Sequence, residues 1–215
     1  MACIVFSAFL MLLVLREIAA WHGVLRLKYL LTPLITMTII ILPVLSIAEE
    51  GTGFYNLFIL AALLLALAAD TLLMVEEVNL LESGMIFFLG GHICFAVAFS
   101  AEHSFRCWNI LLILLMAFID YRVIKKIRVK AGSLFPAVVL YIFSINTMLY
   151  FALTGLNQGF TVRSVCVASG AALFGLSDYI LSRNTFVRTI PHSTVYTWAL
   201  YAPAQFLIAY STLPG

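Results

Sequence analysis

The chain has 215 residues, of which 64% are hydrophobic and only 10% are charged. A soluble domain is typically about half apolar and about a quarter charged, so this composition excludes an ordinary soluble protein and indicates an integral membrane protein. The net charge is only +2 and no nucleic-acid motif is present. We therefore expect membrane lipids, and no nucleic acid, as partners; the sequence does not indicate an oligomeric state.

The apolar segments are long and repeated, which is typical of membrane helices, because a bilayer core needs roughly 20 apolar residues per helix. A membrane barrel would instead show short alternating segments. The predicted fold class is all-α, a polytopic membrane protein with eight transmembrane helices in a single domain, residues 1–215. In chain order the predicted helices are 1–15, 27–48, 54–75, 84–101, 105–119, 133–155, 161–182 and 194–213.

The first segment lacks a basic region and a small-residue cleavage site, so we interpret it as a membrane helix and not as a signal peptide. Ten of the twelve Lys and Arg residues follow the first, third, fifth or seventh predicted helix, whereas only Arg106 and Arg163 lie on the other side. Basic loops stay cytoplasmic, so both termini are expected on the non-cytoplasmic side. The expected location is the inner (plasma) membrane in a bacterium and the endoplasmic reticulum in a eukaryote.

Two aspartates, Asp70 and Asp178, lie inside apolar segments. An ionisable residue at membrane depth is costly and by default suggests a functional site. At about 1.5 Å per residue, both carboxyls are predicted roughly 6–8 Å inside the cytoplasmic boundary. Two carboxylates that share a low-dielectric site do not both ionise readily, which provides one acid and one base. The alternative is a pair of structural aspartates bonded to hydroxyls of neighbouring helices.

Other polar residues are predicted near the same level. His92 is the only histidine inside a predicted helix and is a catalytic candidate, with a structural hydrogen bond as the alternative. The candidate substrate-binding residues are Tyr201, Gln205, Asn146, Thr32 and Ser177. Ser177 has no nucleophile-elbow glycines around it and is not interpreted as a nucleophile.

No metal or other cofactor is expected. A zinc site formed by Asp70, Asp178 and His92 remains an alternative, but no zinc-binding motif supports it. The four cysteines show no paired spacing, so no redox or metal role follows for them.

A faint internal repeat relates the two halves of the chain. Pro33 resembles Pro136, and the segment after Asp70 resembles the segment after Asp178. This pattern predicts two parallel four-helix repeats, related by an axis along the membrane normal. Chance similarity between Leu- and Ala-rich helices is the alternative.

Several short motifs occur in a fixed order along the chain. They are Ala-Asp-Thr-Leu-Leu at 69–73, the series Gly84, Phe88, His92 and Phe95, Ser-Asp-Tyr-Ile-Leu at 177–181, and Tyr201 with Gln205. Together they resemble the lysoplasmalogenase family, the YhhN-type membrane proteins, over nearly the whole chain. Thr32-Pro33 departs from the Lys-Pro that often opens the second helix of that family, Ala69 replaces a glycine, and Phe95 replaces a tyrosine.

The resemblance implies hydrolysis of the vinyl ether of a lysoplasmalogen, a lysophospholipid, to a fatty aldehyde and a glycerophospho-headgroup alcohol. It implies that Asp70 and Asp178 act as acid and base, that His92 positions water, and that Tyr201 orients a carboxylate. The competing hypothesis is a proton-coupled transporter or a non-catalytic lipid-handling protein, because facing carboxylates in a helical repeat also suit a carrier.

Overall fold

The computed structural model describes residues 1–74 and 80–213, without the side chain of Val129. Within these ranges it contains eight α-helices and no strand, which confirms the all-α prediction. The helices are α1 (Ala2–Trp21), α2 (Leu25–Glu50), α3 (Phe54–Leu73), α4 (Leu81–Ser100), α5 (Trp108–Ala131), α6 (Phe135–Gly155), α7 (Val162–Phe186) and α8 (Ser193–Tyr210). Two short 3₁₀ turns, Gly132–Leu134 and Leu156–Gln158, flank α6.

The main error of the sequence prediction is the length of α1 and α5. Both helices continue past the predicted ends, and α5 includes the basic segment up to Ala131. A prediction from hydropathy places the end of a helix where charged residues begin. The helix itself can continue, because Lys and Arg are good helix formers and keep their charged ends in water. Chain geometry stops α5 instead, because Gly132 follows with a φ of 52°, a conformation that suits glycine.

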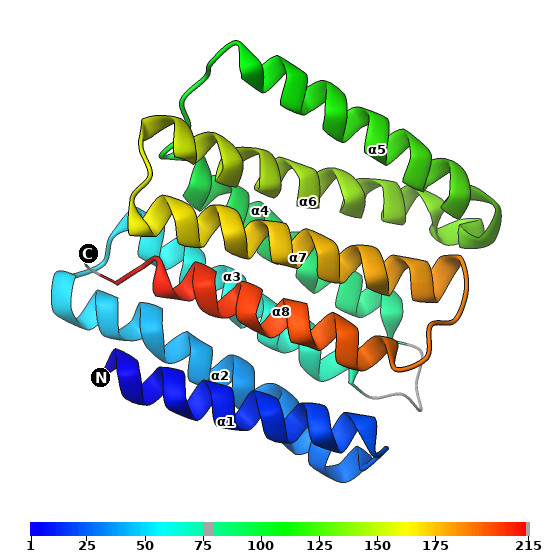
Figure 1. Cartoon of the computed structure of the whole chain (residues 1–215), viewed down its shortest axis with the longest axis horizontal. Helices are drawn as coiled ribbons and strands as arrows, with labels where there is room; N and C mark the ends of the chain where they lie inside the picture. Colours follow the sequence, from blue (N-terminus) through cyan, green and yellow to red (C-terminus); the bar gives the residue numbers. More distant parts are fainter. Residues whose placement is uncertain (75–79, 214–215) are drawn as a thin grey trace.

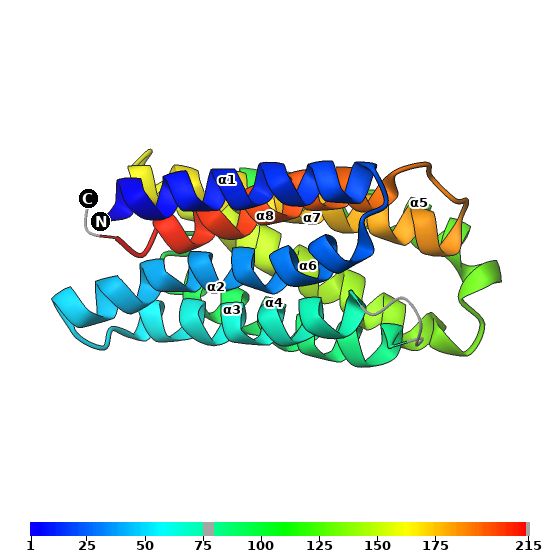
Figure 2. The same cartoon turned by 90° about the horizontal axis from the view of Figure 1, so that it is seen from below.

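The helices pack in two layers, with both termini at one end of the bundle (Figures 1 and 2). One layer contains α1, α8 and α7, and the other contains α2, α3 and α4 (Figure 2). Helix α6 packs against both α4 and α7, and α5 lies outside α6 at the edge of the bundle (Figure 1).

Among the described residues, six helical segments are long and apolar enough to cross a membrane. They are α1, α2, α3, α4, the segment Gly132–Gln158 that contains α6, and α7. Apolar side chains also cover the outer face of the bundle: Ile4 is 73% exposed and Leu111 is 70% exposed. The chain is therefore an integral membrane protein. That α5 and α8 also span the membrane stays a prediction, as does the internal repeat.

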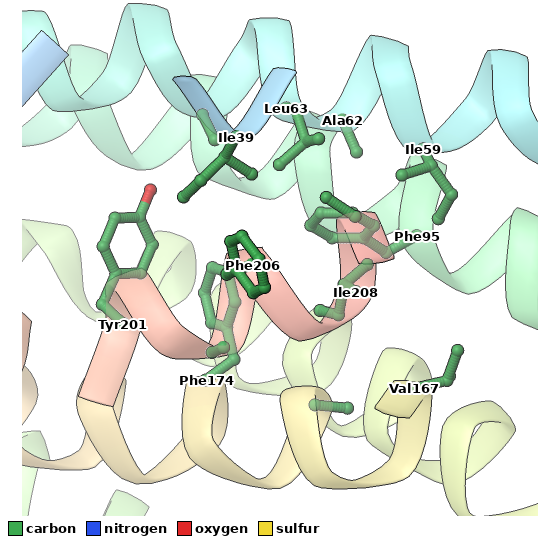
Figure 3. Close-up of a cluster of buried hydrophobic side chains, with 14 of the residues drawn as sticks. Ile39, Ile59, Ala62, Leu63, Phe95, Val167, Phe174, Tyr201, Phe206 and Ile208 are labelled. Carbon is green, nitrogen blue, oxygen red and sulfur yellow. The ribbon is translucent and has the colours of Figure 1, made fainter. Parts of the chain in front are cut away.

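Helices α7 and α8 approach each other closely. A Cβ atom added at Gly170 would lie 2.8 Å from Ile208 Cγ1 and 2.9 Å from the Ala204 carbonyl oxygen. Small residues allow this kind of close packing between membrane helices. The contact leads into a shared core in which Phe174 of α7 lies beside Tyr201 of α8, and the Tyr201 hydroxyl points toward the layer of α2 and α3 (Figure 3).

Candidate active site

A cavity opens at the end of the bundle opposite the termini, where α1, α3 and α7 end and α2 and α8 begin. The empty space at this opening is about 780 Å³, including the part that is open to the outside. Its lining residues are Arg16, Lys28, Thr32, Asp70, Leu73, Met74, Phe88, Ser177, Asp178, Leu181, Asn184, Ser193, Thr194, Thr197, Trp198 and Tyr201.

Asp70 lies in the last turn of α3 and is only 4% exposed. Its carboxyl accepts a hydrogen bond from Thr36 Oγ1 at 2.8 Å. Tyr201 supplies a second contact: the phenol oxygen accepts from Gln205 Nε2, so its proton is available for Asp70, with which it interacts. The Arg16 guanidinium is also close enough for electrostatic attraction to Asp70. Two hydroxyl donors and one cation therefore surround this carboxyl group.

Asp178 is 7% exposed and has a different environment. Its carboxyl accepts one hydrogen bond from the described residues, donated by the Tyr141 hydroxyl at 3.1 Å. His92 Nε2 lies 3.8 Å from Asp178 Oδ2, too far for a direct hydrogen bond. Asp178 and Asp70 are near enough to interact electrostatically. The two carboxyls thus meet at one cavity with unequal sets of neighbours.

The tautomer of His92 follows from its neighbour Ser144. The Ser144 hydroxyl donates its only proton to the Tyr141 carbonyl at 2.7 Å, so toward His92 Nδ1, at 3.2 Å, its oxygen can only accept. This arrangement favours the tautomer with the ring proton on Nδ1, in which Nε2 faces Asp178 as an acceptor. Ring contacts with Tyr141 and Phe174, both with centroids 5.1 Å away, fix the orientation of the imidazole.

Three of the predicted site residues have a buried polar atom without a hydrogen-bond partner within the described part of the chain: Thr32 Oγ1, His92 Nε2 and Gln205 Oε1. An unsatisfied buried group costs about 1–3 kcal/mol. The atoms of Thr32 and His92 lie at or beside the cavity, which indicates that the site is built for water or for polar groups of a ligand.

The structure brings most of the predicted site residues together. Asp70, Asp178, Tyr201, Thr32 and Ser177 line the cavity. His92 lies behind Asp178, and Gln205 lies behind Tyr201. The Ser177 hydroxyl donates to the Thr197 carbonyl at 3.1 Å and so links α7 to α8.

Asn146 is the exception. It is not among the lining residues, and its amide donates to both carboxylate oxygens of Asp120 in α5, at 2.6 Å. Depth along the helix was the only basis for predicting it. Side chains two positions apart on a helix point in nearly opposite directions, so Asn146 faces α5 whereas Ser144 faces His92.

Sequence reasoning missed five residues of this site: Arg16, Lys28, Thr36, Tyr141 and Ser144. Arg16 was predicted just after the first helix and Lys28 at the start of the second, both only as orientation signals. They lie within α1 and α2 and are buried, with exposures of 1% and 6%. The helical spacing of Thr32 and Thr36 was an available signal, because residues four apart share a face.

No three His, Cys, Asp or Glu side chains in residues 1–74 and 80–213 are grouped closely enough to hold a metal ion.

Comparison with known proteins identifies the family. No solved structure matches the chain. Lysoplasmalogenase TMEM86B of Sus scrofa is 29% identical over 175 residues, which cover 79% of this chain and 72% of that protein. A sequence model of the YhhN family matches residues 27–212, a range that includes both aspartates and His92. This protein therefore belongs to the YhhN family.

Proposed function

We propose that this protein hydrolyses the vinyl ether bond of lysoplasmalogens, releasing a fatty aldehyde and a glycerophospho-headgroup alcohol. Membership of the YhhN family and the similarity to a protein named lysoplasmalogenase support this reaction class. The observation that supports it most directly is the shared cavity of Asp70 and Asp178, which come from different helices and have different neighbours.

The neighbours of the two carboxyls support an assignment of the two roles. Thr36, Tyr201 and Arg16 stabilise negative charge at Asp70, so Asp70 is the anion. Within residues 1–74 and 80–213, Asp178 has a single hydroxyl donor, lies near the charge of Asp70, and faces an imidazole nitrogen that accepts in the favoured tautomer. A proton on Asp178 relieves both unfavourable contacts, so Asp178 is the acid.

The reaction then follows in three steps. Asp178 transfers its proton to the β-carbon of the vinyl ether, and the double-bond electrons form the new C–H bond and leave an oxocarbenium ion. Asp70 stabilises this cation and accepts a proton from the water that attacks the cationic carbon. The hemiacetal hydroxyl then gives its proton to Asp178 as the aldehyde C=O bond forms and the bond to the glycerol oxygen breaks. That oxygen takes the proton held by Asp70 and leaves as the alcohol, so both aspartates return to their starting states.

His92 acts beside the acid. Its Nε2, 3.8 Å from Asp178 Oδ2, accepts a hydrogen bond from a water between the two groups, and the Ser144 contact favours the tautomer in which this nitrogen accepts. Tyr201 positions Asp70, since its proton bonds to the carboxylate while Gln205 fixes the phenol.

The direct test is aldehyde release by the purified protein in lipid nanodiscs supplied with lysoplasmalogen. The matched control substrate is the saturated alkyl-ether lysophospholipid, which cannot form an oxocarbenium ion by protonation. We expect aldehyde only from the vinyl ether. No aldehyde from lysoplasmalogen would reject the hydrolase and favour a carrier or a non-catalytic lipid-handling protein.

We further infer that all eight helices span the membrane, with the cavity at the cytoplasmic side and both termini on the other side. The basis is the clustering of basic residues at the cavity end. Because Cys3 is also exposed, the test uses a Cys3→Ser background. In intact cells, a membrane-impermeant thiol reagent should label exposed Cys107 at the opposite end, but not a cysteine introduced as Lys126→Cys when Cys107 is also changed to Ser. The reverse labelling pattern would overturn this orientation.

A further inference from the structure

Two basic side chains line the same cavity as the carboxyls, although neither takes part in the proposed proton transfers. Arg16 comes from α1 and Lys28 from α2, and both are buried. Arg16 is paired with Glu17, but both cations line the cavity, and together they give this part of it a positive charge that suits an anionic group.

Arg16 is held firmly in place. Its Nη1 contacts Glu17 Oε1 at 2.8 Å and the Thr194 carbonyl at 3.4 Å, and its guanidinium lies over the Trp198 ring with 4.5 Å to the centroid. A pre-positioned guanidinium loses little freedom when it binds an anion, and its planar donors suit phosphate oxygens.

Helix α2 places the basic group and the acid-base site in line. Lys28, Thr32 and Thr36 are spaced four residues apart and so lie along one face of the helix. Lys28 and Thr32 line the cavity, and Thr36 bonds to Asp70. At 1.5 Å per residue, Lys28 and Thr36 are roughly 12 Å apart along the helix. The six bonds from the phosphorus of a lysoplasmalogen to its vinyl ether span roughly 7–8 Å at ordinary bond lengths, and the flexible lysine side chain can cover the difference.

Thr32 lies between these two ends, and its buried hydroxyl has no hydrogen-bond partner within the described residues. A polar group of a ligand that extends from Lys28 toward Asp70 would meet this hydroxyl. The two cations and this threonine therefore match a single anionic ligand with a polar backbone.

We propose that Arg16, Lys28 and Thr32 form a subsite for the phosphodiester of the lysolipid headgroup, next to the acid-base site. This inference rests on the proposed function, since that function supplies the lipid. Free inorganic phosphate has the same chemistry and is the competing source of the anion.

Binding without turnover provides the test. The probe is the saturated alkyl-ether lysophospholipid, compared with the alkylglycerol of the same chain length, which lacks the phosphate. In nanodiscs, Lys28→Gln should weaken binding of the lysophospholipid roughly ten- to hundredfold, the range for loss of a charge-assisted hydrogen bond, and should change alkylglycerol binding less than about twofold. Lys28→Arg should restore most of the affinity.

Arg26→Gln is the matched control, because Arg26 is an exposed cation two residues away on α2 that does not line the cavity. It should leave both affinities unchanged. Equal losses for the two probes in Lys28→Gln, or no loss for either, would overturn the subsite. The subsite would also be overturned if inorganic phosphate stabilised the wild type against thermal unfolding as much as the lipid does, while Lys28→Gln left the affinity for the lipid unchanged.

The same measurements separate this inference from the proposed reaction. Lys28-dependent lipid binding without aldehyde release would reject the hydrolase and retain the subsite. Aldehyde release together with lipid binding that is unchanged in Lys28→Gln would retain the hydrolase and reject the subsite.

Discussion

Replacing Asp178 with asparagine separates the chemistry of the site from its architecture. Asparagine has nearly the same shape, and its carbonyl oxygen can still accept the hydrogen bond from the Tyr141 hydroxyl. It cannot donate a proton to carbon. We therefore expect a folded protein that binds lipid and does not turn it over.

The structure sets the expected magnitudes. One neutral hydrogen bond to Asp178 is retained, and a potential buried charge is removed, so the change in stability should be below about 1 kcal/mol. General acid catalysis contributes about a hundred- to ten-thousandfold, which equals about 2.7–5.5 kcal/mol of activation free energy. Turnover should fall by at least this factor, because none of the other described lining residues has the position of Asp178.

Aldehyde release from lysoplasmalogen measures turnover, and thermal unfolding in the same nanodiscs measures stability. Asp120→Asn is the matched control, since Asp120 also lies in a helix and bonds to Asn146, but it does not line the cavity. It should keep wild-type turnover. If Asp178→Asn retains more than about a tenth of wild-type turnover, the assignment of Asp178 as the acid is wrong.

In deuterium oxide, the aldehyde should gain one deuterium on the carbon next to the carbonyl, which mass spectrometry measures. An aldehyde without this deuterium would show that protonation does not occur at carbon. The rate should be bell-shaped in pH, because a high pH removes the proton from Asp178 and a low pH neutralises Asp70; a flat profile would contradict the pairing. Ser144→Ala should reduce turnover about tenfold and shift the ¹⁵N signals of His92 toward a mixture of tautomers, whereas a merely structural serine would leave those signals unchanged. Gly170→Val should lower the free energy of unfolding by about 1–3 kcal/mol, because its Cβ would lie 2.9 Å from the Ala204 carbonyl oxygen; unchanged thermal unfolding would argue against this close contact.

Hydropathy predicted the helices well because the cost of exposing a polar backbone to lipid leaves few alternatives to a helix. It failed at the end of α5, where charge marks the edge of the apolar core but not the end of the helix. Asp70 and Asp178 could be predicted because ionisable groups at this depth are rare and expensive.

The partners of these aspartates were not predictable in the same way. Thr36 and Tyr141 are hydroxyl residues, which are common in membrane helices, and only the packing of α2 against α3 and of α6 against α7 gives them a role. Asn146 was predicted at the site from its depth alone, but its side chain faces Asp120 in α5 and not the cavity. Lys28 was assigned to orientation because sequence alone does not reveal that its side chain turns inward.

The cavity lies at one end of the bundle. In the proposed orientation this is the level where lipid gives way to water, which has a consequence for the proposed reaction. Its two products belong to different phases. The aldehyde keeps the hydrocarbon chain, which is held in the bilayer by about 0.8 kcal/mol per methylene, whereas the headgroup alcohol has no chain and dissolves in water. The reverse reaction would require both to return to the cavity together. Dilution of the alcohol into the aqueous phase thus drives the cleavage forward without any further source of energy.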